Sequence, residues 1–140
     1  MMRVEIENRY LKQAIDLLFK LSLRGKQSRH RTRFIKLLNE RFIQVEEERK
    51  QLAEEFAEKD ENGQPIIEDG RYKIVGDNIE QFRKEFEDLM SEKFVIEGGN
   101  FKETLEVVRD ILLNCDEYFS GEQAFVYDYL CEQFEKGDEE

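Results

Sequence analysis

The chain has 140 residues, of which 39% are hydrophobic and 39% charged, and its formal net charge is -11. This length suits one ordinary core, and a single Pro beside 11 Phe and 5 Tyr favours a folded, helix-rich chain over a disordered one. No stretch approaches the roughly 20 apolar residues that cross a bilayer, and Glu5 and Glu7 interrupt the N-terminal segment where a signal peptide is apolar. We therefore expect a soluble, cytoplasmic protein with no membrane partner.

Positive charge is concentrated near the N-terminus. Residues 1–36 hold ten Lys or Arg against three acids, a net charge of +7, and the rest of the chain has a net charge of -18. The segment KLSLRGKQSRHRTRFIK, residues 20–36, carries seven Lys or Arg and no acid. Such asymmetry indicates an electrostatic role, either within the fold or toward a partner.

The first predicted elements are a short strand and a helix. Val4 and Ile6 alternate with charged residues, as they do in a half-buried strand, here over residues 2–6. Asn8 then suits the N-cap of a first helix, which ends near residues 22–25. The apolar residues on one face of this helix are Leu11, Ala14, Ile15, Leu18 and Phe19.

A second, longer helix is predicted from Ser28, a candidate N-cap, to about residue 58. Its middle, VEEERKQ, is polar around most of the circumference. One face therefore packs on a partner helix while much of the helix stays in water. The apolar residues of that face have a heptad-like spacing: Phe34, Leu37, Leu38, Phe42, Val45, Leu52 and Phe56.

The following segment predicts a β-hairpin at about residues 65–75. Asp69-Gly70 separates two β-prone runs, and both positions of such a tight turn need positive φ. Asp77 with Glu80 three residues later is a capping box for a third helix. The apolar face of that helix consists of Ile79, Phe82, Phe86, Leu89 and Met90.

The last third of the chain predicts one strand and two helices. FVIEGGN begins with a short strand, residues 94–97, which is a candidate partner for the N-terminal strand. Asn100 with Glu103, and Ser120 with Gln123, are capping boxes for a fourth and a fifth helix. The apolar residues of these helices are Phe101, Leu105, Val108, Leu112, Cys115 and Phe119, then Phe125 or Val126, Tyr129, Leu130 and Phe134.

Together these elements predict a mainly α fold of about five helices in a single domain. Residues 28–94 form a long antiparallel helix pair linked by the β-hairpin, which we expect to be an arm. Residues 1–27 and 95–136 form a compact base, with the small two-stranded pairing described above. The last four residues, 137–140, form an acidic tail. A long arm with a decorated tip is more common in interaction proteins than in enzymes.

Motifs for catalysis, cofactors and metals are missing from the sequence. It has no GxGxxG, GxxxxGK[ST], GxSxG or HExxH pattern, and its single histidine, His30, has no carboxylate nearby in sequence to orient it. Cys115 and Cys131 lie in apolar patterns, so we expect reduced core thiols. Residues 58–69 match a calcium loop poorly, because Pro65 occupies its eighth position. We expect no catalytic residue, no cofactor and no metal site.

The basic segment is the best candidate for a binding site. Part of it precedes the long helix and part lies on one side of that helix, a geometry that suits phosphate contacts. The candidate partner-binding or nucleic-acid-binding residues are Arg24, Lys26, Arg29, His30, Arg31, Arg33 and Lys36. Against nucleic acid, the whole chain is acidic, and no aromatic residues are interleaved for base stacking. Three interpretations stay open: internal pairing with acids of the other helices, a protein partner, and nucleic acid.

Three parts of the sequence carry a resemblance to a known family, and together they cover most of the chain. They are LSLRGKQSRHRTRF at residues 21–34, AEKDENGQPIIEDGRYKI with the following FRKEFEDLMSE at 57–74 and 82–92, and FSGEQAFVYDYLCEQFE at 119–135. Their order resembles an uncharacterised family of small proteins from tailed phages and prophages of Gram-positive bacteria. The resemblance implies a phage or prophage accessory protein in the host cell, and it implies no particular chemistry.

The sequence as a whole favours a non-enzymatic phage or prophage protein that acts by binding a host or phage protein. An inhibitor of a host or defence protein and an assembly factor are both open. The alternatives are a nucleic-acid-binding accessory protein that uses residues 20–36 and an acidic mimic of DNA, formed by residues 37–140. The heptad-like rows also leave a homo-oligomer open.

Overall fold

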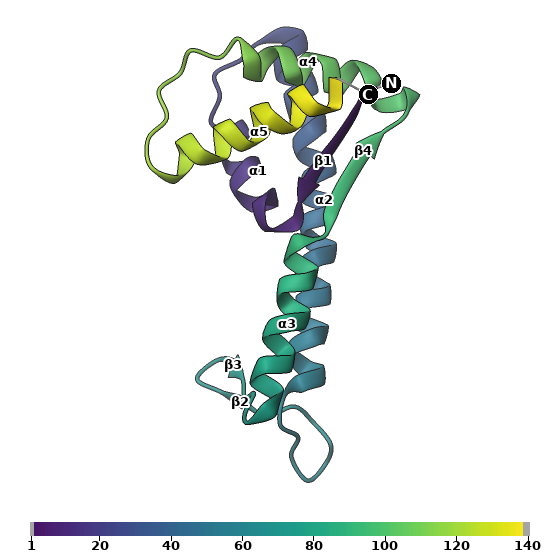
Figure 1. The fold of residues 1–140 in the computed structure, drawn as a ribbon, viewed down its shortest axis with the longest axis vertical. Helices are drawn as coiled ribbons and strands as arrows, with labels where there is room; N and C mark the ends of the chain where they lie inside the picture. Colours follow the sequence, from purple (N-terminus) through teal and green to yellow (C-terminus); the bar gives the residue numbers. More distant parts are fainter. Residues whose placement is uncertain (1, 139–140) are drawn as a thin grey trace. The chain divides into compact units, whose positions relative to one another are not determined.

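A computed structural model describes residues 2–138 of the chain. Within these residues the chain is mainly helical, with five α-helices and two small antiparallel sheets (Figure 1). In chain order the elements are β1 (Arg3–Glu7), α1 (Leu11–Phe19), α2 (Gly25–Phe56), β2 (Ile67–Glu68), β3 (Arg71–Tyr72), α3 (Asp77–Ser91), β4 (Lys93–Glu97), α4 (Lys102–Leu113) and α5 (Glu122–Asp138). The chain divides into two compact units: unit 1 comprises Met1–Phe42 with Lys93–Glu140, and unit 2 comprises Ile43–Glu92.

Unit 1 contains the predicted pairing of the N-terminal strand. Strands β1 and β4 lie side by side and antiparallel, with Val4 opposite Ile96 and Ile6 opposite Phe94 (Figure 1). Val4 and Ile6 are fully buried, and the residues that alternate with them, Arg3, Glu5 and Glu7, are half-buried, as the alternating pattern predicts. The prediction of this two-stranded pairing is confirmed.

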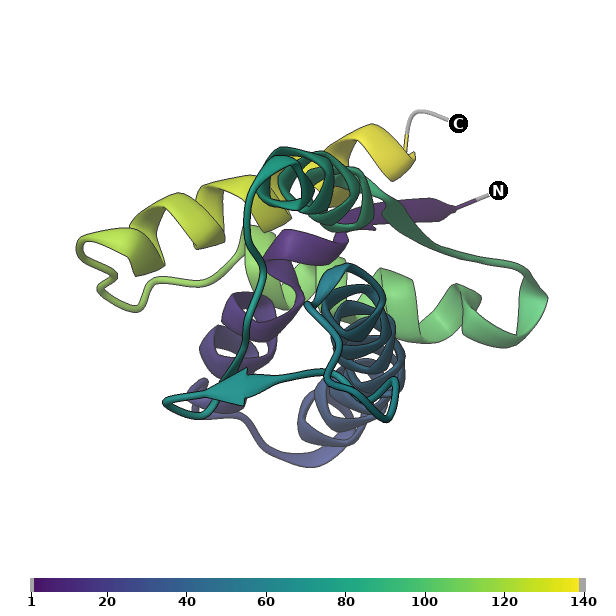
Figure 2. The ribbon, with the colours of Figure 1, turned by 90° about the horizontal axis from the view of Figure 1, so that it is seen from below.

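Helix α5 organises the core of unit 1. It packs against β1, α1 and α4 (Figure 2). Its Phe134 meets Phe34 of α2 edge to face, with ring centroids 5.6 Å apart, and both side chains are fully buried. Full burial of such a side chain contributes roughly 1.5–3 kcal/mol relative to exposure. The largest other fully buried side chains of unit 1 are Val4, Ile6, Leu11, Leu17, Leu18, Leu38, Leu105, Leu112 and Leu130.

Unit 2 consists of the second half of α2, the β-hairpin and α3. Strands β2 and β3 pair antiparallel around Asp69 and Gly70, whose φ angles are 52° and 78°. Both residues are therefore left-handed, as the Asp-Gly turn requires. The hairpin is tied to the end of α2, because Glu58 N–H donates to the carbonyl of Lys73 and Tyr72 Oη donates to Glu54 Oε1, at 2.8 and 2.7 Å. The helix pair and hairpin of the predicted fold are confirmed.

The starts of the helices differ from the predicted N-caps. Asn8 lies in a 3₁₀ turn, and its side chain accepts a hydrogen bond from α2. Ser28 lies inside α2, which already begins at Gly25. Helices α3 and α4 have no side-chain hydrogen bond at their N-caps, so Asp77 and Asn100 do not act as predicted. A tertiary contact engages the side chain of Asn8, and backbone turns at the starts of α3 and α4 replace the side-chain hydrogen bond that the capping rule expects.

The ends of the last two helices also differ from the sequence prediction. Helix α4 ends before Cys115, and Phe119 lies in the following loop, where its ring stacks on Tyr127 at 4.7 Å. Helix α5 extends to Asp138 and so includes the start of the predicted acidic tail. The remainder of that tail, residues 139–140, lies outside the described residues.

Candidate functional site

The basic segment lies in unit 1, in the loop after α1 and in about the first three turns of α2. One row of α2, formed by His30, Phe34 and Leu38, is buried, with 3%, 0% and 0% exposure. These residues are four apart and share one face of the helix, which fixes its rotation. The basic side chains are thereby divided between the edge of the buried face and the solvent.

Two members of the segment contact α4. Lys26 Nζ lies 2.7 Å from Glu103 Oε1, and this hydrogen bond and charge lower the pKa of Glu103. His30 Nδ1 lies 2.8 Å from Thr104 Oγ1, and both of these side chains are buried. The other ring nitrogen, Nε2, lies 3.9 Å from Glu103 Oε1. Lys26 and His30 therefore connect the start of α2 to the start of α4.

His30 is a structural residue of this contact. Its burial lowers its pKa, and the nearby guanidinium of Arg33 lowers it further, with smaller contributions from Lys26 and Arg29. The carboxylate of Glu103 opposes these effects. Because the pKa falls below the ordinary value of 6.5, the imidazole is neutral at pH 7. A buried, neutral ring adds no charge to a binding surface.

Arg31 is used inside unit 1 as well. Its Nη1 donates hydrogen bonds to the carbonyls of Leu18 and Leu21, both at 2.8 Å. Leu18 lies in the last turn of α1 and Leu21 lies two residues beyond it, at the negative end of the helix dipole, which attracts positive charge. Arg31 therefore stabilises the end of α1, an assignment that sequence spacing alone could not make.

The other four candidate residues of the segment face the solvent. Arg24, Arg29, Arg33 and Lys36 are exposed, and none of their side chains forms an ion pair or hydrogen bond within the described part of the chain. We call these four residues the basic face. Internal pairing thus accounts for Lys26, His30 and Arg31, and it leaves the basic face unexplained.

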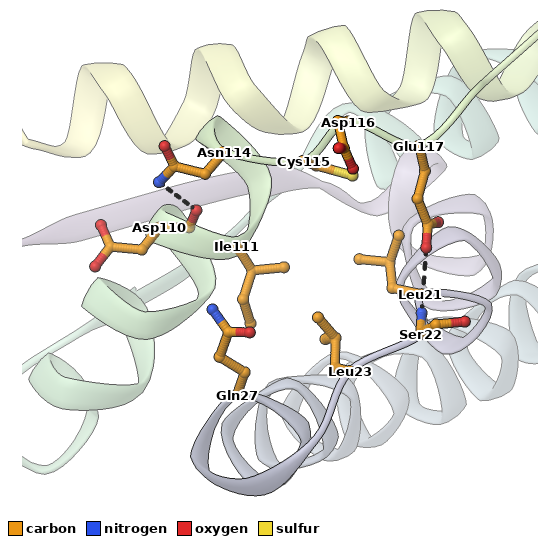
Figure 3. A pocket seen from close by; sticks show the side chains of 10 residues that line it. All are labelled: Leu21, Ser22, Leu23, Gln27, Asp110, Ile111, Asn114, Cys115, Asp116 and Glu117. Atoms are coloured by element: carbon orange, nitrogen blue, oxygen red, sulfur yellow. Dashed lines mark hydrogen bonds between the residues drawn. The ribbon is translucent and has the colours of Figure 1, made fainter.

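A pocket of about 150 Å³ lies beside the loop that leads into α2 (Figure 3). Ser22 N–H donates to Glu117 Oε1 at 3.3 Å, and Asn114 Nδ2 donates to the carbonyl of Asp110 at 2.9 Å. The pocket is lined by Leu21, Ser22, Leu23, Gln27, Asp110, Ile111, Asn114, Cys115, Asp116 and Glu117. Its carboxylates disfavour an anionic ligand. The hydrogen bond from Ser22 to Glu117 holds the loop that carries Arg24.

The two cysteines are free and half-buried. Cys131 Sγ donates to the carbonyl of Leu112 at 3.8 Å, and the hydroxyl of Tyr127 donates to the same carbonyl. Burial raises the pKa of Cys131 and of Tyr127. A thiol with a raised pKa is a weak nucleophile at neutral pH.

A second surface, in unit 2, was not identified as a site by sequence reasoning. The apolar side chains of α3 form a row that we call the α3 stripe: Ile79, Phe82, Phe86, Leu89 and Met90. Every residue of α3 is described, and none of them is buried. Phe82 contacts Phe56 of α2 and Phe86, with ring centroids 6.4 and 5.9 Å apart. The sequence signal that could have identified this surface is the large apolar area of the stripe. A single neighbouring helix, α2, covers only part of that area.

Neither a metal-binding cluster nor a membrane-spanning helix is present in the described residues, 2–138. They contain no group of three or more His, Cys, Asp or Glu side chains that could hold a metal ion. Their helices include none with the length and apolar character needed to span a membrane.

The fold and surfaces define a mainly helical protein with a basic face in unit 1 and an acidic helix pair with a half-buried apolar stripe in unit 2. The chain belongs to the family described as "Protein of unknown function (DUF1617)", whose family model matches residues 2–140. Comparisons with curated proteins and with solved structures gave no match.

Proposed function

We propose that this protein is a non-enzymatic accessory protein that binds another protein through the helix pair of unit 2. The observation that carries the proposal is the α3 stripe, an apolar row on an amphipathic helix with no buried residue. In a folded domain, such a row normally faces a core. A row left half-exposed is typical of a surface that a partner covers.

The packing of unit 2 supports this proposal. All of unit 2 lies within the described residues, and only three of its side chains are buried: Val45, Ala53 and Ala57. Two of these are alanines, which bury little apolar area. Ile79, at one end of the stripe, is 36% exposed, and the other four members are half-buried. A third helix packed along the uncovered side of the α3 stripe would bury its remaining apolar area. Such burial stabilises a complex by about 25 cal/mol per Å² of apolar surface.

The charge of unit 2 indicates the chemistry of the partner. Ile43–Glu92 holds seven Lys or Arg and 16 Asp or Glu, a net charge of -9. Glu85 lies along one edge of the α3 stripe, and Glu87 lies toward the other. A second copy would bring the same negative charge, and this repulsion opposes self-pairing. The complementary partner is a helix with one apolar face and flanking Lys or Arg.

The order of sequence motifs supports a more specific context. It resembles small proteins of tailed phages and prophages, so we propose that the partner is a host or phage protein. Both an inhibitor of a host or defence protein and an assembly factor fit a docking surface that is apolar at its centre and flanked by acidic side chains. Identification of the partner separates these two roles.

Photo-crosslinking tests the proposal directly. We would place p-benzoylphenylalanine at Phe86 in the α3 stripe or, as the matched control, at Phe125, which is 80% exposed on α5 of unit 1. In a lysate of a Gram-positive host, we expect position 86 to crosslink to a protein with a basic, amphipathic helix, and position 125 not to do so. Crosslinking of position 86 only to a second copy of the chain, or to nothing, would refute the proposal.

Binding of the purified partner provides the quantitative test. We expect Ile79→Glu to weaken it at least tenfold, because this change places a charge in the apolar contact. Ile79 is at the edge of the stripe, so the helix content of this variant should remain that of the wild type by circular dichroism. Phe125→Ser serves as the control and should bind as the wild type does. Equal losses in the two variants would contradict a contact through the α3 stripe.

A further inference from the structure

We propose a second binding site in unit 1, at which the basic face binds the phosphodiester backbone of nucleic acid. The basic face consists of Arg24, Arg29, Arg33 and Lys36, as defined above. This inference is independent of the proposed protein partner, because it rests on different residues in a different unit.

Helical spacing gathers three of these charges on one side of α2. Arg29, Arg33 and Lys36 follow the spacing of four and three residues that places side chains on one helical face. They extend over roughly 10 Å along the helix axis, at 1.5 Å per residue. Arg29 and Arg33 each precede a buried residue, His30 and Phe34, and so point about 100° away from the buried row. Arg24 is exposed and lies in the loop that precedes α2.

Hydrogen bonds and ion pairs within the described residues do not account for these four side chains. Lys26 and Arg31, from the same segment, have partners in α4 and α1, whereas the basic face has no ion pair or hydrogen bond to the described residues. Positive charge near the start of a helix also opposes the helix dipole, so Arg29 does not stabilise α2. Four exposed cations without internal pairing indicate an external anion.

The composition of the face favours phosphate over an acidic protein. Three of the four cations are Arg, whose planar guanidinium binds two phosphate oxygens at once. Protein contacts depend on central apolar or aromatic side chains, and no large hydrophobic residue between Leu21 and Phe42 is exposed. The absence of aromatic residues on the face also removes base stacking. The site therefore contacts the backbone without reading the sequence.

The neighbouring acid is already engaged. Glu103 is the carboxylate that interacts with Arg33, and its closest partner is Lys26, at 2.7 Å. The net charge of the whole chain, -11, weakens the attraction of a polyanion at long range. We therefore expect modest affinity that depends strongly on salt.

Fluorescence anisotropy with labelled 20-mers tests the site. If all four cations contact phosphates of duplex DNA, log K should fall against log salt with a slope of about -3.6, which is roughly a 150-fold loss between 50 and 200 mM salt. Single-stranded DNA or RNA should give a loss of roughly 50-fold over the same range. We expect wild-type binding at 50 mM salt.

The test variant removes the basic face, and the control removes the same charge elsewhere. The test variant carries Arg24→Ala, Arg29→Ala, Arg33→Ala and Lys36→Ala. The control carries Lys50→Ala, Arg71→Ala, Lys84→Ala and Lys102→Ala, all at exposed positions. We expect the test variant to lose binding at least 50-fold at 50 mM salt and the control to lose less than fivefold. Circular dichroism checks that both remain folded.

Three results would overturn the proposal. The first is no wild-type binding of any 20-mer at 50 mM salt with 100 µM protein. The second is an equal loss in the test and control variants, because binding would then depend on total charge alone. The third is displacement of DNA by poly-glutamate at an equal concentration of charge, which would identify the ligand as an acidic protein.

Discussion

Gly137 should be intolerant of even the smallest side chain, because the last turn of α5 lies against the backbone of β1. A Cβ atom at position 137 would lie 2.0 Å from the carbonyl oxygen of Arg3. Real Cβ contacts essentially never fall below 3.0 Å, so one of the two backbones must move by about 1 Å. Strand β1 is itself paired with β4, which restricts its movement.

The magnitude of the Gly137→Ala effect follows from two opposing terms. Overpacking of this kind costs about 1–3 kcal/mol. Replacing glycine by alanine in a helix stabilises the folded state by up to about 1 kcal/mol. The gain is smaller at the penultimate residue of α5, because helix ends fray. We therefore expect the free energy of unfolding to fall by about 1–2 kcal/mol.

Urea denaturation followed by far-ultraviolet circular dichroism measures this change. Gly99→Ala is the matched control, because no atom lies within 4 Å of its added Cβ and its φ is not in the left-handed region. We expect Gly99→Ala to stay within about 0.5 kcal/mol of the wild type. A Gly137→Ala variant at least as stable as the wild type would refute the close approach of α5 to β1.

Two further predictions concern the interior part of the basic segment. Arg31→Ala removes a charged donor from the carbonyls of Leu18 and Leu21, and should cost about 1.5–3 kcal/mol in urea denaturation, whereas Arg29→Ala should change stability by less than about 0.5 kcal/mol. Equal costs would contradict the different roles of the two arginines. Because folding lowers the pKa of His30, the unfolded chain binds more protons there, so stability should fall as the pH drops below 6.5. His30→Gln should remove this fall below pH 6.5; a variant with the wild-type pH profile would exclude His30 as its source.

The elements of this fold were accessible from sequence where local chemistry decides them. The alternation of Val4 and Ile6 gave the buried face of β1, because side chains of a strand point to alternate sides. Asp69-Gly70 gave the hairpin turn, because both residues tolerate positive φ. The N-caps were less accessible, since the side chain of Asn8 finds its partner on α2, far away in sequence.

The sequence by itself determined the mainly helical class, the β-hairpin, a candidate pairing of the N-terminal strand with residues 94–97, and the location of a basic segment without acids. Only the tertiary structure decided which of the charged side chains bind other groups within the fold and which face the solvent. Arg31 and Arg33 are two residues apart and chemically identical, yet one meets the carbonyl groups that end α1 and the other faces the solvent. The same holds for α3, whose amphipathic pattern is local but whose partial burial depends on its contact with α2. Patterns of charge and apolarity are properties of the chain, whereas partners and burial are set by contacts between residues that are distant in sequence.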